Sequence, residues 1–249
     1  MTVEDNGLDG QIALPRKERE IIGKPKVTVL ISGNGSNLQE IIDEVENGSI
    51  DATLVNVISN VPEAYGLTRA RDHGIPDILL PSRGKMRDVE ARKAYESELL
   101  TVLDQERPDI IVLAGWMMIV GDELLTELQN REIVVMNLHP ALLTPDASPT
   151  VHTSFGELPV IRGAHAIEEA YNLNLPGSGV TVHQVLPGQG YDVGPIILTK
   201  EVERTMDDTL DTWRKKIHEA EHEVLPKALN KVLGVISQNI DASKGEVLW

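Results

Sequence analysis

The sequence predicts one α/β domain with a doubly wound, mostly parallel, Rossmann-like sheet. Three observations support this prediction. Short runs rich in Val, Ile and Leu, typical of buried parallel strands, alternate with amphipathic segments of helical period. A glycine-rich turn directly follows the first run, as in open α/β sheets that bind ligands. The length of 249 residues suits a single domain.

The apolar runs give the strands in order. They are predicted at Lys26–Ser32, Ala52–Ser59, Asp77–Leu80, Asp109–Ala114, Ile133–Leu138, Gly179–Leu186 and Pro195–Val202. Helices are predicted at Asn37–Glu46, Glu63–His73, Asp88–Glu106, Gly163–Leu173 and Asp207–Leu233, the last kinked at Pro226.

The remaining segments set the domain limits. Residues 143–162, rich in Pro, Ser and Thr, are expected to form a long loop. Residues 1–24 read as an N-terminal surface extension, 25–234 as the domain and 235–249 as a C-terminal tail.

Composition excludes several functional classes. The net charge of −16 argues against nucleic acid as a partner, because phosphate-backbone binding needs clustered Lys and Arg. There is no apolar run long enough for a membrane span, and the acidic N-terminus lacks the apolar core of a secretory signal. The absence of cysteine excludes disulfides and thiolate metal sites. We therefore expect a cytoplasmic protein. The sequence carries no signal for an oligomeric state.

The turn after the first strand is a candidate phosphate site. Gly35, Ser36 and Asn37 open a helix, whose free N–H groups and positive dipole end favour an anion. An ordinary capped βα turn is the alternative. The dinucleotide-binding pattern is incomplete, since Leu38 replaces its third glycine and the second strand ends in Ser59-Asn60 without an acid.

Two polar side chains mark the end of the fifth strand. Asn137 and His139 are two residues apart and therefore project from the same face, at the sheet edge where ligands bind. Together they could stabilise an oxyanion, although a lone histidine at a strand end is more often structural. Asp192 lies in a glycine-rich turn, and its local sequence predicts only a turn residue.

One apparent metal motif is better read as a polar helix face. His218-Glu219-Ala220-Glu221-His222 fits the zinc-peptidase pattern literally, with its histidines on one side of a helix. The positions that would complete the longer motif hold Leu225 and Ala228. We therefore predict no metal.

Several motifs in fixed order carry a family resemblance. They are KVTVLISGNGSNLQEIID, VISN at Val57–Asn60, AGWM at Ala114–Met117, NLHPALL from Asn137, and DVGPII from Asp192. Together they resemble the phosphoribosylglycinamide formyltransferases (GAR transformylases), folate-dependent enzymes of purine biosynthesis, over about Lys26 to Leu233. The SGNGSNL form separates this family from methionyl-tRNA formyltransferase and formyltetrahydrofolate hydrolase.

The resemblance implies direct transfer of a formyl group from 10-formyltetrahydrofolate to the amine of glycinamide ribonucleotide, through a tetrahedral oxyanion and without a metal. It implies catalytic roles for Asn137, His139 and Asp192. The implied substrate-binding residues are Gly35, Ser36, Asn37, His218 and Glu221. The implied folate-binding residues are Arg92, Met117, Ile119, Val120 and Asn137.

This sequence departs from the family in places. His218 stands where many members have Gln, and Met118 where many have Arg. The stretch after Leu143 is longer than the common form. Two alternatives stay open: a formyltetrahydrofolate hydrolase or a formyltransferase acting on another amine, and a phosphate-ligand-binding module without catalysis.

Overall fold

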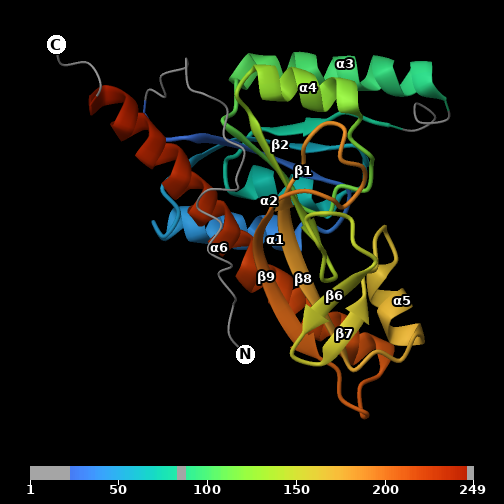
Figure 1. Cartoon of the computed structure of the whole chain (residues 1–249). Helices are drawn as coiled ribbons and strands as arrows, with labels where there is room; N and C mark the ends of the chain where they lie inside the picture. The colour runs from blue at the N-terminus through green and yellow to red at the C-terminus, as the bar shows by residue number, and fades with distance from the viewer. Residues whose placement is uncertain (1–22, 83–87, 246–249) are drawn as a thin grey trace.

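A seven-stranded sheet forms the centre of the computed structural model, which describes residues 23–82 and 88–245 (Figure 1). Its strand order is β3-β2-β1-β4-β5-β8-β9. The strands of the sheet are β1 (Lys26–Ile31), β2 (Thr53–Ser59), β3 (Asp77–Leu79), β4 (Ile110–Leu113), β5 (Val134–His139), β8 (Gly177–Gln184) and β9 (Ile196–Glu203). The helices are α1 (Ser36–Glu46), α2 (Tyr65–Asp72), α3 (Val89–Glu106), α4 (Asp122–Asn130), α5 (Ala166–Asn172) and α6 (Leu210–Gly245).

The first five strands pair in parallel, whereas β8 pairs antiparallel with both β5 and β9. The predicted mostly parallel, doubly wound sheet is therefore confirmed. The strand order reverses at β1, which lies between β2 and β4. In open α/β sheets, ligands bind at the carboxyl ends of the strands beside such a reversal. The turns after β1, β4 and β5 are thus the expected location of a site.

Helices cover both faces of the sheet, with α3 and α4 on one face and α1, α2 and α6 on the other (Figure 1). Strand β1 shows how the sequence produces two cores. Its Val27, Val29 and Ile31 face α1, α2 and α6, while Leu30 faces α3 and α4. Alternate residues of a strand point to opposite faces, so a strand buried on both sides is largely apolar, and the buried Thr28 of β1 donates its hydroxyl to Asn56 Oδ1 at 2.7 Å.

The structure differs from the sequence prediction in two segments. The expected loop at 143–162 contains a hairpin, β6 (Thr150–Thr153) and β7 (Gly156–Pro159), which pairs outside the main sheet. Helix α4 was not predicted, although Asp122 and Glu123 in its first turn and the spacing of its buried leucines are helix signals. The helix is short, nine residues, so its period is weakly marked in the sequence.

The structure describes the predicted C-terminal tail in part, but little of the predicted N-terminal extension. Helix α6 continues without interruption through Pro226 and into the predicted tail, as far as Gly245. Most of the predicted N-terminal extension, residues 1–24, lies outside the described residues, so its nature stays a prediction.

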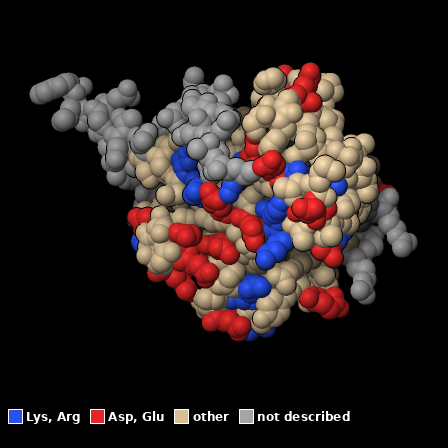
Figure 2. Space-filling model, turned by 90° about the horizontal axis from the view of Figure 1, so that it is seen from below, with Lys and Arg blue, Asp and Glu red and all other residues tan. Residues whose placement is uncertain are grey.

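Acidic and basic side chains are interspersed on the face shown in Figure 2, with no broad basic area among the residues described there. Across residues 23–82 and 88–245, no helix is both long and apolar enough to cross a membrane.

Candidate active site

Three polar side chains predicted to be catalytic converge beside the end of β5. His139 Nδ1 lies 3.6 Å from Asp192 Oδ2, and Asn137 Nδ2 lies 3.5 Å from Asp192 Oδ1. Asp192 comes from the turn between β8 and β9, more than fifty residues along the chain. The fold thus brings to His139 a carboxylate whose local sequence predicted only a turn.

His139 is buried, and its surroundings define which ring nitrogen carries the proton. Its Nε2 lies 2.8 Å from the main-chain oxygen of Ile161. A carbonyl oxygen can only accept, so Nε2 must be the protonated nitrogen of the neutral ring. Nδ1, which faces Asp192, is therefore the nitrogen that can take up or release a proton.

Asn137 is oriented by a histidine that the sequence analysis did not single out. Asn137 Nδ2 donates to His183 Nε2 at 3.2 Å, and His183 Nδ1 donates to the main-chain oxygen of Gln184 at 3.2 Å. Burial lowers the pKa of His183 to about 4, against an opposing influence of Asp192 that raises it. A neutral His183 accepts one N–H of Asn137, and the other N–H makes only a long contact, 3.5 Å, with Asp192 Oδ1.

Asp192 is held at both its side chain and its main chain. Gly163 N donates to Asp192 Oδ2 at 2.9 Å, and Arg162 Nε donates to the main-chain oxygen of Asp192 at 3.3 Å. The residue has φ 52°, an unusual left-handed conformation for a non-glycine residue. Its placement therefore depends on these contacts.

The glycine-rich turn after β1 is shaped by close packing against α2. Gly35 has φ 73°, and a Cβ atom there would lie 2.6 Å from Gly66 Cα. Gly66 N donates to the main-chain oxygen of Gly33 at 3.2 Å. No larger residue fits at Gly35, so the turn stays tight and Ser36 begins α1 directly after it.

The predicted substrate residues Asn37, His218 and Glu221 also meet, although they come from α1 and α6. Glu221 Oε2 lies 3.2 Å from Asn37 Nδ2 and 2.8 Å from His218 Nδ1. The hydrogen bond that His218 donates to Glu221 is the main cause that raises the pKa of His218. Asn37 Oδ1 is buried without a hydrogen-bond partner within the described structure, as expected for a group that awaits a ligand.

The second histidine of the zinc-like motif has a different partner. His222 Nδ1 lies 3.5 Å from Glu40 on α1, whereas His218 pairs with Glu221. In the described part of the chain, no group of three or more His, Asp or Glu side chains is arranged to hold a metal ion.

Apart from Asn137 on β5, the predicted folate residues lie on α3 and on the loop between β4 and α4. Met117 and Ile119 are exposed apolar side chains, with 63% and 45% of their surface accessible, and Val120 packs partly against the core. The loop is fixed at both ends, because Met117 N donates to Ser32 Oγ at 2.9 Å and Gly121 N donates to Glu96 Oε1 at 2.7 Å.

Arg92 lies near this loop because it contacts Glu96, which also accepts from Gly121 N. Arg92 Nε is 3.9 Å from Glu96 Oε1. Within the described chain, Arg92 Nε is buried without a hydrogen-bond partner. A guanidinium suits the carboxylates of a folate, and exposed Met117 and Ile119 suit its flat rings. Met118, between them, packs instead against the α3–α4 core. The residues present therefore fit a folate.

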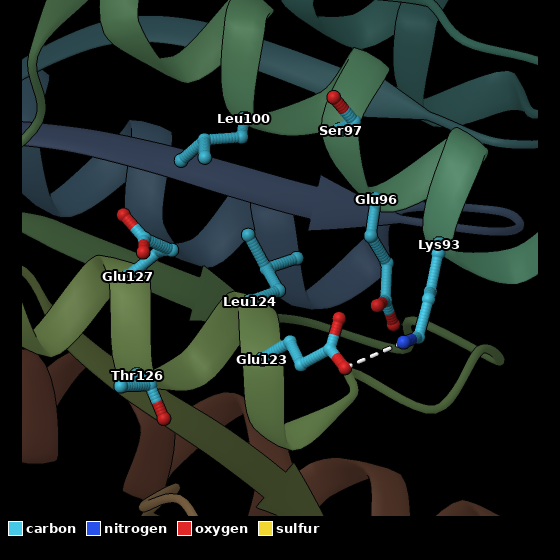
Figure 3. Close-up of a pocket in the computed structure, with 8 residues that line it drawn as sticks. All are labelled: Lys93, Glu96, Ser97, Leu100, Glu123, Leu124, Thr126 and Glu127. Carbon is cyan, nitrogen blue, oxygen red and sulfur yellow. Dashed lines mark ion pairs between the residues drawn. The ribbon is translucent and has the colours of Figure 1, made fainter.

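A cavity of about 400 Å³ lies elsewhere, between α3 and α4 (Figure 3). Glu96, Glu123 and Glu127 line it, and Lys93 pairs with Glu123 at 2.6 Å. This largely acidic lining disfavours an anionic folate or phosphate, so we place neither substrate there.

A glycine-rich turn that opens a helix, an adjacent polar trio and an exposed apolar loop lie at the carboxyl edge of an open sheet, an arrangement typical of an enzyme site for a small molecule. Comparison with known proteins identifies the family to which the chain belongs. A profile of the formyl transferase family matches residues 25–229. The chain belongs to this formyltransferase family.

Three of the relatives match this chain over nearly their whole length. Phosphoribosylglycinamide formyltransferase of Schizosaccharomyces pombe is 37% identical, over 83% of this chain and 96% of the relative. The enzyme of that name from Saccharomyces cerevisiae is 35% identical, over 84% and 97%. The crystal structure of phosphoribosylglycinamide formyltransferase from Bacillus halodurans superposes with a TM-score of 0.70 at 33% identity, over 84% and 95%.

Proposed function

We propose that this protein transfers the formyl group of 10-formyltetrahydrofolate to the amine of glycinamide ribonucleotide. The observation that carries the proposal is the convergence of Asn137, His139 and Asp192 at the end of β5, beside a turn suited to a phosphate. Relatives that carry this activity in their names match the chain over most of its length.

The bound formyl-folate would supply an electrophilic formyl carbon to the amine of the ribonucleotide. As the new C–N bond forms, negative charge develops on the formyl oxygen. The bond to N10 of the folate then breaks, and one proton moves from the attacking amine to N10. The protein must therefore stabilise an oxyanion and provide a path for one proton.

Asn137 and His139 are suited to the oxyanion. Asn137 gives one amide N–H to neutral His183, and the other, which makes only a 3.5 Å contact with Asp192 Oδ1, would donate to the oxyanion. The imidazolium of His139 has a second donor at Nδ1, since Nε2 is already bonded to Ile161. Donors fixed before the reaction need no reorganisation when charge develops, which makes them effective.

The carboxylate of Asp192 has two tasks in this proposal. At 3.6 Å from His139 Nδ1, it stabilises positive charge on the ring. Together, Nδ1 and the carboxylate form the path by which a proton leaves the amine and reaches N10. Neither task requires a covalent enzyme intermediate.

For the ribonucleotide, we propose that Gly35, Ser36 and Asn37 bind the phosphate at the start of α1. His218 and Glu221 would contact the remainder of the substrate, because their hydrogen bonds link them to Asn37. We propose that the folate is bound by Arg92, Met117, Ile119, Val120 and Asn137.

One assay separates this function from the alternatives. The purified protein is incubated with a chromogenic 10-formyl-folate, with and without glycinamide ribonucleotide, and the products are analysed by mass spectrometry. We expect deformylation only when both substrates are present, with formyl-glycinamide ribonucleotide as the product. Formate release without the ribonucleotide would indicate a hydrolase, and binding without turnover would indicate a non-catalytic module.

We also propose that the protein is located in the cytoplasm, where both substrates would be available. Cell fractionation would test this location.

A further inference from the structure

The β6–β7 hairpin is braced against the main sheet at its tip and closed at its base. At the tip, Ser154 N donates to Glu201 Oε1 of β9 at 3.0 Å. The Phe155 ring packs so closely on Gly177 that a Cβ there would lie 2.4 Å from the ring. At the base, Val160 N donates to the main-chain oxygen of Pro149 at 2.8 Å. The hairpin is therefore a fixed support.

The chain that leaves this hairpin contacts two of the three proposed catalytic side chains, His139 and Asp192. The main-chain oxygen of Ile161 accepts from His139 Nε2, and Gly163 N donates to Asp192 Oδ2. The Ile161 side chain is buried in a small cluster with Ala141 and Ala166, which fixes this segment in place. Arg162 lies between these two contacts in sequence.

The half-buried Arg162 guanidinium links the catalytic turn to the chain entering the hairpin. Its Nε donates to the main-chain oxygen of Asp192 at 3.3 Å. One terminal nitrogen donates to Thr144 Oγ1 at 3.2 Å and to the main-chain oxygen of Ser148 at 3.3 Å. A rigid planar guanidinium with several N–H donors can hold these acceptors in one geometry, whereas a lysine ammonium cannot.

The turn that carries Asp192 needs such a restraint. Gly188, Gly190 and Gly194 all have positive φ, as does Asp192 itself. Glycine-rich turns have many accessible conformations, and a left-handed non-glycine residue persists only when its surroundings fix it. Tyr191, the neighbour of Asp192, is 64% exposed and provides little packing.

We propose that Arg162 is a positioning residue for catalysis: by holding the main-chain oxygen of Asp192 against the base of the β6–β7 hairpin, it keeps the Asp192 carboxylate directed at His139. Arg162 would touch no reacting atom. This inference rests on the proposed function, and specifically on a catalytic role for Asp192. In this proposal, the β6–β7 hairpin is the rigid support to which Arg162 anchors the turn that carries Asp192.

Replacement of Arg162 tests the proposal through the separation of kcat from KM. Arg162→Met keeps a long apolar stem but removes the donors. We expect kcat to fall about 30-fold, with both KM values changed less than about threefold. Arg162→Lys should recover part of the loss, since an ammonium can bond one of the acceptors. Millimolar ethylguanidinium should partly restore kcat in Arg162→Ala but not in Asp192→Asn.

Arg204→Met is the matched control. Arg204 also donates to a main-chain oxygen and a side-chain oxygen, those of Tyr171 and Asn174, outside the proposed site. We expect its kcat to stay close to that of the wild type. A kcat in Arg162→Met within about twofold of wild type, or an equal loss in both variants, would overturn the proposal. Wild-type kcat in Asp192→Asn would instead refute the catalytic role of Asp192 itself.

Discussion

Asn137 and His183 lie directly opposite each other across the antiparallel β5–β8 pair, and Asn137 Nδ2 donates to His183 Nε2 at 3.2 Å. Because His183 Nδ1 donates to a main-chain oxygen, the neutral ring has a lone pair on Nε2 and the amide of Asn137 has one preferred orientation. His183 therefore acts on the proposed oxyanion site without belonging to it.

This relationship predicts the effect of two substitutions at His183. Phe would fill the space but remove the acceptor, so Asn137 could rotate away from the oxyanion. We expect kcat to fall about 20-fold with little change in either KM. Gln can still accept from Asn137 and should lose less activity. Steady-state kinetics of the two variants provides the measurement, and equal losses in both would show that the acceptor is unimportant.

The lowered pKa of His183 also predicts an acid-sensitive fold. Its pKa is about 4 in the folded protein and near 6.5 when exposed, so between these values the unfolded chain binds the additional proton. The free energy of unfolding should therefore fall as the pH drops from about 6.5 to about 4, with a slope of up to about 1.4 kcal/mol per pH unit from this group. Urea denaturation across that range should show a shallower slope in His183→Gln. Parallel curves would contradict the assignment.

The contacts of Asn137 show which parts of the site can be predicted from the sequence and which cannot. Asn137 and His139 could be paired from the sequence because a strand places residues two apart on one face. The contact between Asn137 and His183 depends on the register of an antiparallel pair more than forty residues apart, which no local pattern encodes.

The segment after β5 also shows the difference between local sequence patterns and contacts made by the fold. Its Pro, Ser and Thr content predicted a loop, yet the hairpin forms because Val151 and Leu158 pair across it and Phe155 packs on Gly177. Only the family resemblance indicated a catalytic Asp192, because tertiary contacts rather than its local sequence place it beside His139. The alternating apolar strands, in contrast, follow from local composition, and the main sheet was therefore predictable.

His218 should make ribonucleotide binding depend on pH. Glu221 raises the pKa of His218 above its ordinary value, so the side chain is an imidazolium at low pH and loses its charge as the pH rises through that raised pKa. A cation beside the proposed site favours the phosphorylated substrate, so KM for the ribonucleotide should increase with pH over this transition. The facing groups are Glu221, Arg214 and Glu168.

The comparison with His218→Gln isolates this effect. Titration of the substrate itself is common to both proteins, so the ratio of their KM values reports on His218 alone. We expect that ratio to change by about threefold to tenfold between pH 6 and pH 8.5. A constant ratio would mean that His218 does not contribute charge to the site.

The zinc-like motif predicts the outcome of metal removal. His218 and His222 engage different carboxylates, Glu221 and Glu40, and no third ligand joins them within the described structure. Activity should therefore survive prolonged incubation with EDTA, and elemental analysis should find less than stoichiometric zinc. One zinc per chain, lost together with activity on chelation, would contradict the metal-free mechanism.

The last prediction concerns the pair formed by His139 and Asp192. Asp192→Asn keeps an oxygen that can accept from Gly163 N, so the turn should retain its shape while the charge beside His139 Nδ1 is lost. We expect kcat to fall at least about a hundredfold, roughly 2.7 kcal/mol, with little change in either KM. His139→Ala should lose a similar amount.

Because the carboxylate would act through the ring, removing both groups should cost little more than removing one. The double variant should therefore retain far more activity than the product of the two single losses predicts. Single-turnover measurement of formyl transfer in all four proteins makes this comparison without interference from product release. If the losses multiply, Asp192 and His139 act independently, and the 3.6 Å approach of carboxylate and ring has no catalytic meaning.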